Sequence, residues 1–188
     1  QPHHLIRSVE LRLRSLGDCV LTTPALALLH ACRPDLHVAV MVEPRFAAVY
    51  DGNPAVKETL PPSAFLAWQF KPHLTVNLHG GPASARMTFA SRAKHRAGFA
   101  HFRQQFAYNR KIPRAQEILG EERTVHTAEH VASALFWLGL PKQEIPRARL
   151  FTSGHAPTPS PRAVIHPFAS APDKSWPVDR FVTLCRWL

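Results

Sequence analysis

A strand, a tight turn and a helix follow one another near the start of the chain, and this order constrains the fold more than any other feature. Val9, Leu11 and Leu13 alternate with polar residues, which is the period-2 pattern of a strand. The apolar pattern breaks at residues 15–18 and resumes over residues 20–29 with helical spacing. A strand–turn–helix junction is the first half of a β-α-β unit, so the sequence predicts an α/β protein with a parallel sheet.

The turn itself, Ser15-Leu16-Gly17-Asp18, indicates a ligand site, because open α/β sheets bind ligands at the carboxyl ends of their strands. It lacks the spaced glycines of a dinucleotide motif and the lysine of a phosphate-binding loop. Asp18 is expected at the start of the helix, where free backbone N–H groups favour a negative charge. Two roles stay open: Asp18 acts as a general base, or Asp18 and Ser15 only cap the helix.

A second junction of the same kind lies further along the chain. Residues 74–78 form a strand pattern that runs into His79-Gly80-Gly81-Pro82, and a helix is expected over residues 83–91. Glycines let a ligand approach the backbone, and proline suits the first turn of a helix. This loop is expected on the same side of the sheet as Asp18, and a tight turn without a ligand is the alternative.

Positive charge is concentrated in one segment of this 188-residue chain, whose formal net charge is +10. Residues 59–116 contain no Asp or Glu, and they carry Lys71, Arg86, Arg92, Lys94, Arg96, Arg103, Arg110, Lys111 and Arg114. Such a block implies an anionic partner, which is a nucleic acid, a membrane surface or an acidic substrate. Aromatic residues interleave with the cations over residues 102–111, and we favour aromatics in the core over stacking on single-stranded nucleic acid.

Two observations limit the class of protein. The three cysteines, Cys19, Cys32 and Cys185, are too far apart for a Cys-x-x-Cys metal site and odd in number, which favours a reducing cytosol. No apolar run approaches the ~20 residues that cross a bilayer. Residues 126–130 spell His-x-x-Glu-His, a zinc-protease pattern, but no third ligand stands out and we expect no metal.

The motifs, taken in order, resemble glycosyltransferase family 9, the ADP-heptose:lipopolysaccharide heptosyltransferases. The resemblance begins in Ser15-Leu16-Gly17-Asp18 and Leu21-Thr22-Thr23-Pro24-Ala25-Leu26. It continues in Val42-Glu43-Pro44-Arg45-Phe46, Asn53-Pro54, Asn77-Leu78-His79-Gly80-Gly81-Pro82, His95-Arg96-Ala97-Gly98-Phe99, His166-Pro167-Phe168-Ala169-Ser170 and Lys174-Ser175-Trp176-Pro177. The chain departs from the family pattern at Arg14, where many members have serine, and at Phe168, where glycine is usual.

The resemblance implies the glycosyltransferase-B architecture, with two Rossmann-like domains facing across a cleft. Residues 1–152 are then a Rossmann-like acceptor domain, with a parallel sheet, flanking helices and a last strand over residues 149–152. Residues 153–162 form a proline-rich linker. Residues 163–188 are the start of a truncated nucleotide-sugar domain, with a strand at 163–165 and a helix from Pro177.

The implied reaction is the inverting, metal-independent transfer of a heptose or related sugar from a nucleotide sugar to the lipopolysaccharide inner core. The donor implied is ADP-heptose, and no cofactor is expected. Asp18 matches the proposed catalytic base, and Ser170 and Lys174 match donor-binding positions. The acceptor-binding positions are Ser15, Gly17, His79, Gly80, Gly81 and Arg96.

The anionic lipopolysaccharide core would account for the basic segment. It also implies a cytoplasmic protein in peripheral contact with the inner membrane, with no nucleic-acid partner. Two alternatives stay open: a nucleic-acid-binding module that uses the basic, aromatic segment 86–114, and an inactive acceptor-binding remnant.

Overall fold

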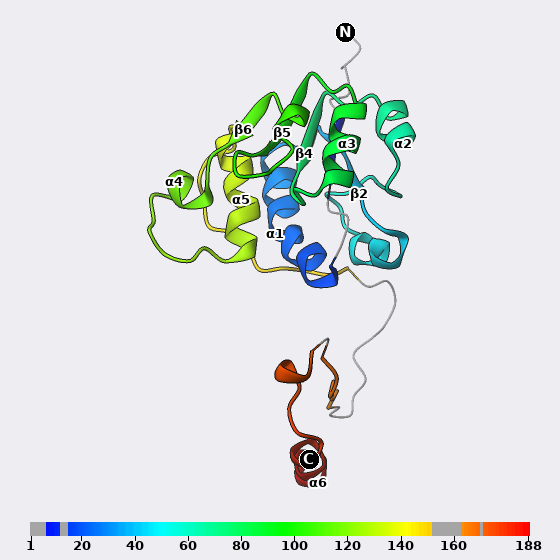
Figure 1. Ribbon diagram of the computed structural model, residues 1–188, viewed down its shortest axis with the longest axis vertical. Helices are drawn as coiled ribbons and strands as arrows, with labels where there is room; N and C mark the ends of the chain where they lie inside the picture. The colour runs from blue at the N-terminus through cyan, green and yellow to red at the C-terminus, as the bar shows by residue number, and fades with distance from the viewer. Residues whose placement is uncertain (1–6, 12–14, 152–162, 170) are drawn as a thin grey trace. The chain divides into compact units, whose positions relative to one another are not determined.

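The computed structural model describes residues 7–11, 15–151, 163–169 and 171–188 (Figure 1). The chain divides into two compact units, residues 1–153 and 154–188, and each is described by itself. The proline-rich linker expected at residues 153–162 lies outside the described residues, as does Arg14.

The first unit is built on a parallel sheet of six strands in the order β3-β2-β1-β4-β5-β6. The strands are β1 (Arg7–Leu11), β2 (His37–Met41), β3 (Glu58–Leu60), β4 (Leu74–Asn77), β5 (His95–Phe99) and β6 (Arg110–Ile112). This is the order of a doubly wound Rossmann-like sheet, in which the direction of winding reverses between β1 and β4. The predicted α/β class and parallel sheet are confirmed.

Helices cover both faces of this sheet. They are α1 (Leu16–Cys32), α2 (Ala64–Gln69), α3 (Pro82–Ala90), α4 (Ala115–Leu119) and α5 (Thr127–Trp137), with the 3₁₀ helices η1 (Pro44–Tyr50) and η2 (Gln105–Ala107). The predicted helices at 83–91 and after residue 15 correspond to α3 and α1. The short elements α2, α4 and β6 had no visible periodicity in the sequence.

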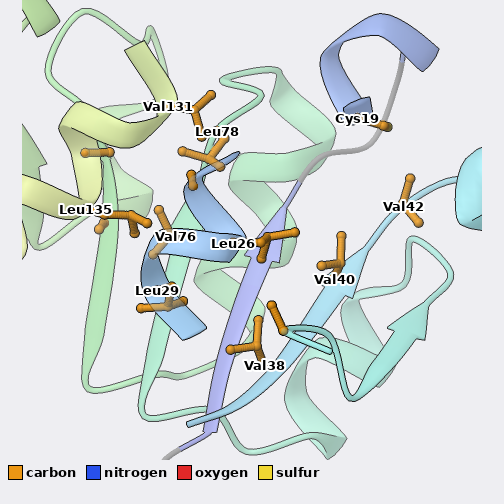
Figure 2. Packing of buried hydrophobic residues seen from close by; sticks show 14 of the residues in the cluster. Cys19, Leu26, Leu29, Val38, Val40, Val42, Val76, Leu78, Val131 and Leu135 are labelled. Atoms are coloured by element: carbon orange, nitrogen blue, oxygen red, sulfur yellow. The ribbon is translucent and has the colours of Figure 1, made fainter. Parts of the chain in front are cut away.

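Strand β2 shows why its sequence is apolar at nearly every position. Val38 and Val40 pack in the same core cluster as Leu26 of α1, and Figure 2 shows these side chains between helix and sheet. Ala39 and Met41 pack on the other face of the sheet, against α2 and α3. Successive side chains of a strand point to opposite faces, so a sheet covered on both faces requires apolar residues throughout. Burial of a side chain such as Leu26 contributes about 1.5–3 kcal/mol.

The strand predicted over residues 149–152 is wrong as far as the structure describes it. Residues 149–151 belong to no strand, and Thr152 lies outside the described residues. The backbone N–H of Arg149 donates to Thr23 Oγ1 of α1 at 3.1 Å. The segment therefore lies along helix α1. A strand would need the backbone of a neighbouring strand as its hydrogen-bond partner, which a position at the sheet would give.

In its described residues, the second unit contains a 3₁₀ turn, η3 (Pro172–Lys174), and one helix, α6 (Val178–Trp187). The helix confirms the prediction from Pro177, and Trp176 packs edge-to-face on Phe181 with ring centroids 5.1 Å apart. The strand predicted at 163–165 is wrong, because residues 163–169 belong to no strand or helix. A strand needs a neighbouring strand to bond its backbone, and the described part of this unit has none.

Candidate functional site

The two predicted junctions meet at the point where the strand order reverses. Strand β1 pairs with β4 in parallel, with Leu11 opposite Asn77 at their carboxyl ends. The chain then enters α1 at Leu16 and α3 at Pro82. Both turns therefore leave the same edge of the sheet from adjacent strands, which is where doubly wound sheets bind their ligands.

Asp18 lies in the first turn of α1 and is half-buried, whereas Ser15 and Gly17 before it are exposed. Ser15 has a φ of 74° and a ψ of 114°, a conformation that residues with a side chain rarely adopt. Its side chain makes no capping hydrogen bond, so the helix-cap role considered for Ser15 is wrong. Strained backbone of this kind is often found at functional sites.

The Thr-Thr-Pro motif explains how α1 tolerates a proline in its interior. Pro24 has no N–H to donate to the carbonyl of Val20, four residues earlier. The Thr23 hydroxyl donates to that carbonyl at 2.8 Å. The missing backbone bond is thereby replaced, and the helix continues to Cys32.

Other side chains hold the turn that carries Asp18. The Thr22 hydroxyl donates to the backbone carbonyl of Asp18 at 2.8 Å, and the Tyr50 hydroxyl donates to that of Cys19 at 3.4 Å. Cys19, Thr22 and Tyr50 are nearly or fully buried. The backbone beneath the Asp18 carboxylate is therefore fixed by the core.

On the other side of the reversal point, the amide of Asn77 organises the loop after β4. Asn77 is fully buried, and its Oδ1 accepts from the backbone N–H groups of His79 and Gly80, at 3.0 Å each. Its Nδ2 donates to Ser84 Oγ at 3.0 Å and to Tyr108 Oη at 2.8 Å. Both donors and both acceptor positions of the amide are used. Burial raises the pKa of Tyr108 to about 12, so the phenol is protonated at neutral pH.

Glycine is required at two positions around this network. Gly80 has a φ of +74°, and a Cβ on it would lie 2.5 Å from the ring of Phe102. A Cβ on Gly98 of β5 would lie 2.5 Å from the ring of Tyr108. Only glycine lets these rings pack against the backbone. At Gly81 a Cβ would meet the ring of His79 at 3.2 Å, so this ring lies against its own loop.

Ser15, Gly17, Asp18, His79, Gly80 and Gly81 are thus brought to one edge of the sheet, but Arg96 is not. Arg96 pairs with Thr75 near the amino end of β5, towards the opposite edge. Its guanidinium donates to the carbonyls of Ala93 and Ala107, at 2.9 and 3.1 Å. In this structure Arg96 therefore links the loop before β5 to the end of η2.

The two predicted donor-binding residues belong to the second unit. Lys174 ends η3 and is exposed. Ser170 lies outside the described residues. Their roles therefore stay predictions.

The His-x-x-Glu-His pattern forms the start of helix α5. Glu129 accepts from the backbone N–H of His126 at 2.9 Å, and His126 Nδ1 accepts from the N–H of Ala128. Arg123 donates two hydrogen bonds to Glu129, and these, followed by the His126 N–H, lower the pKa of Glu129 to about 2. The described ranges hold no group of three or more His, Cys, Asp or Glu side chains with metal-binding geometry.

Most cations of the basic segment are exposed, and the aromatic residues Phe102, Phe106 and Tyr108 divide into two sets. Phe102 is half-buried and Tyr108 is buried, as the core interpretation predicts. Phe106 is 63% exposed, which that interpretation did not foresee. The cations on the surface include Arg86, Arg92, Lys94, Arg103, Arg110, Lys111 and Arg114. Among the helices that the structure describes, none has the length and apolar character to cross a membrane.

Comparison with known proteins gives a consistent result. The sequence model of one family, described as glycosyltransferase family 9 (heptosyltransferase), matches residues 73–188, more than half of the chain. No curated protein matches. A glycosyl transferase family 9 structure from Veillonella parvula DSM 2008 is similar, with a TM-score of 0.80 and 19% identity over 97% of this chain and 59% of the other.

Two structures from E. coli share the fold. The heptosyltransferase WaaC with ADP-2-deoxy-2-fluoro heptose has a TM-score of 0.75 and 20% identity over 97% of this chain and 65% of that one. The ADP-heptose lps heptosyltransferase II has a TM-score of 0.61 and 14% identity, over 79% of this chain and 47% of that one. This chain therefore spans less than two thirds of the length of these structures. The family model matches most of the length of this chain, and the Rossmann-like sheet carries the predicted motifs at the point where its strand order reverses. The chain therefore belongs to glycosyltransferase family 9.

Proposed function

We propose that this chain is the acceptor-side part of an enzyme that transfers a heptose or related sugar from a nucleotide sugar to the lipopolysaccharide inner core. The observation that carries the proposal is the position of Asp18. It stands on a fixed helix turn opposite the His79-Gly80-Gly81 loop, at the reversal point of the sheet. Family membership supports the reaction class, and one similar structure holds an ADP-heptose analogue.

The chemistry proposed for Asp18 is general-base catalysis. An acceptor hydroxyl attacks the anomeric carbon of the donor sugar, the new C–O bond forms, and the bond from that carbon to the diphosphate breaks. The hydroxyl proton passes to the Asp18 carboxylate as the attack proceeds. Attack from the side opposite the leaving diphosphate inverts the anomeric carbon, and a metal ion has no assigned part in this scheme.

The leaving diphosphate gains negative charge, and cationic or hydrogen-bonding groups must stabilise it. We assign this role to Lys174 and Ser170, on the basis of their match to the family motif. ADP-heptose is the proposed donor, because the similar structure of the E. coli heptosyltransferase WaaC holds ADP-2-deoxy-2-fluoro heptose.

The acceptor is proposed to lie against Ser15 and Gly17 on one side and the loop of His79, Gly80 and Gly81 on the other. Gly17 and this loop are accessible, and glycine lets a sugar approach the backbone closely. Phosphates and carboxylates of the inner core would complement the basic segment. The proposed location is the cytoplasmic face of the inner membrane, in peripheral contact.

Replacing Asp18 by Asn tests the proposed base. In the enzyme that carries this chain, we expect Asp18→Asn to lower kcat by about 10² or more, with the affinity for the nucleotide sugar nearly unchanged. The assay measures transfer from ADP-heptose to a deacylated inner-core acceptor. Asp35→Asn, which changes an exposed carboxylate paired with Arg33, is the matched control. A turnover of Asp18→Asn within a few-fold of the parent would remove Asp18 from the chemistry.

A further inference from the structure

Four large aromatic side chains form an exposed patch on the first unit. Phe65 and Trp68 of α2, Phe89 of α3 and Phe106 of η2 are 63, 45, 55 and 63% exposed. We name these four residues the aromatic patch. Phe65 contacts Trp68, and Phe89 contacts Phe106, with ring centroids 5.9 Å apart in each pair. Helices α2 and α3 lie side by side (Figure 1), and Phe65, Trp68 and Phe89 line one open hollow of about 690 Å³.

Exposed aromatic residues that cluster in this way indicate an interaction surface. On a surface without a binding partner, exposed apolar side chains are normally scattered singly. Each ring of the patch lies in contact with another ring or lines the shared hollow. The proposed reaction uses none of them.

Three arginines lie beside the aromatic patch. Arg92 and Arg96 line the hollow, and the Arg96 guanidinium carbon lies 5.9 Å from the centroid of the Phe89 ring. Arg86 is exposed and precedes Phe89 by three residues in α3, so the two share a face of the helix. All of these residues fall within the segment 59–116, which contains no acidic residue. The charge of the surface is therefore complementary to an anionic partner.

The arrangement of the rings favours a bilayer over a nucleic acid. Bases stack on open ring faces. Here the Phe65–Trp68 rings are tilted by 43° and the Phe89–Phe106 rings stand at 63°, so neither pair offers a parallel slot. Apolar rings flanked by cations are instead the composition of surfaces that enter the headgroup region of anionic membranes.

We propose that the aromatic patch, with Arg86 and Arg92, docks the first unit onto an anionic phospholipid bilayer with its rings in the headgroup region. The inference rests on the proposed function, which puts the acceptor at a membrane, and names the surface that meets this membrane. Phe89 lies in the last turn of α3 and Arg92 follows that helix, so both are remote from the Asp18 edge, where α3 begins. Phe89 and Arg92 therefore lie away from the candidate acceptor site.

The test is binding of the 188-residue chain to sedimented vesicles, which needs no transfer activity and so can fail independently of the proposed function. Vesicles of phosphatidylcholine with 30% phosphatidylglycerol, about a third anionic lipid, are compared with pure phosphatidylcholine at low and high salt. We expect Phe89→Ser to weaken binding about tenfold. Leu150→Ser is its control, since Leu150 has the same 55% exposure outside the patch.

Charge is tested in the same assay. We expect Arg86→Gln to weaken binding about fivefold. Arg147→Gln, which removes an exposed cation from the α1–α5 side of the sheet, is expected to leave binding unchanged. Unaltered far-ultraviolet dichroism and melting temperature of each variant show that the fold is kept. The proposal would be overturned by equal binding to neutral and anionic vesicles, or by equal effects of Phe89→Ser and Leu150→Ser. It would also be overturned if a single-stranded oligonucleotide displaced the vesicles at a concentration below that of the lipid.

Discussion

At the scale of single residues, the amide of Asn77 fixes the geometry of the loop that follows β4. Its amide joins the loop after β4, helix α3 and the segment that follows η2. A buried polar group with every partner in place fixes one conformation, whereas an incomplete set would be costly. The position of His79 and Gly80 therefore depends on a side chain that contacts no substrate in the proposed reaction.

Removing that amide should destabilise the first unit. We expect Asn77→Ala to lower the free energy of unfolding by about 3 kcal/mol, because it leaves the Ser84 and Tyr108 hydroxyls and two backbone N–H groups short of partners. Urea unfolding followed by circular dichroism measures the change. Asn109→Ala removes two hydrogen bonds of an exposed side chain, and a smaller loss is expected for it. Equal losses for the two variants would contradict the assigned role of Asn77.

At the scale of elements, the start of α5 shows how charge stabilises a helix end. The Glu129 carboxylate bonds the N–H of His126, a donor that the helix leaves free, and also pairs with Arg123. Because the pKa of Glu129 falls from 4.5 to about 2 on folding, its ionised form favours the folded state. The stabilisation is complete above pH 4.5 and is lost as the pH falls towards 2.

Replacing the Glu129 carboxylate by a carboxamide should therefore lower the stability of the fold by an amount that depends on pH. We expect Glu129→Gln to melt at a lower temperature than the parent at pH 7, and the difference to shrink as the pH is lowered from 5 to 3. Thermal unfolding at a series of pH values measures this. Glu144→Gln changes an exposed acid, for which we expect no such trend. A difference that is constant with pH would show that the pair with Arg123 does not control the helix end.

The elements also show how far the sequence could be interpreted. Strand β2 and helix α1 were predictable because their apolar patterns run over several residues, and the two junctions were correctly expected at one edge of the sheet. Strand β6 has only three residues, too few for a period to be visible. The bond from Asn77 to Tyr108 joins residues 31 apart in the sequence, and only the fold brings them together. The prediction of a strand at 163–165 was wrong because a strand forms only where a neighbouring strand can bond its backbone.

At the scale of the whole molecule, the two units contribute unequally to the proposed reaction. The first unit contains the six-stranded sheet, and the proposed acceptor-side residues Asp18 and His79 follow its strands. The described part of the second unit contains one 3₁₀ turn and one helix with no buried residue. A site for a nucleotide normally encloses most of the ligand surface.

Binding of ADP to the 188-residue chain should accordingly be weak. We expect a dissociation constant of about 1 mM or higher, equivalent to about −4 kcal/mol, because Lys174 is exposed on a single turn. Isothermal titration calorimetry with ADP measures it, and Lys174→Ala should change the heat little. Micromolar binding would mean that the first unit holds the nucleotide and that the two sites are wrongly assigned.

The complete set of bonds on Asn77 also bears on motion. A loop that closes over its substrate must exchange one set of bonds for another, and such closure often limits the rate of an enzyme. Here the backbone of His79 and Gly80 is bonded to a side chain with no exposed surface, and Gly80 is pressed against the ring of Phe102. Closure at this loop would break those bonds. We therefore expect this loop to have its binding conformation before the acceptor arrives. The conformational entropy of the loop is then lost during folding, and acceptor binding does not have to order it.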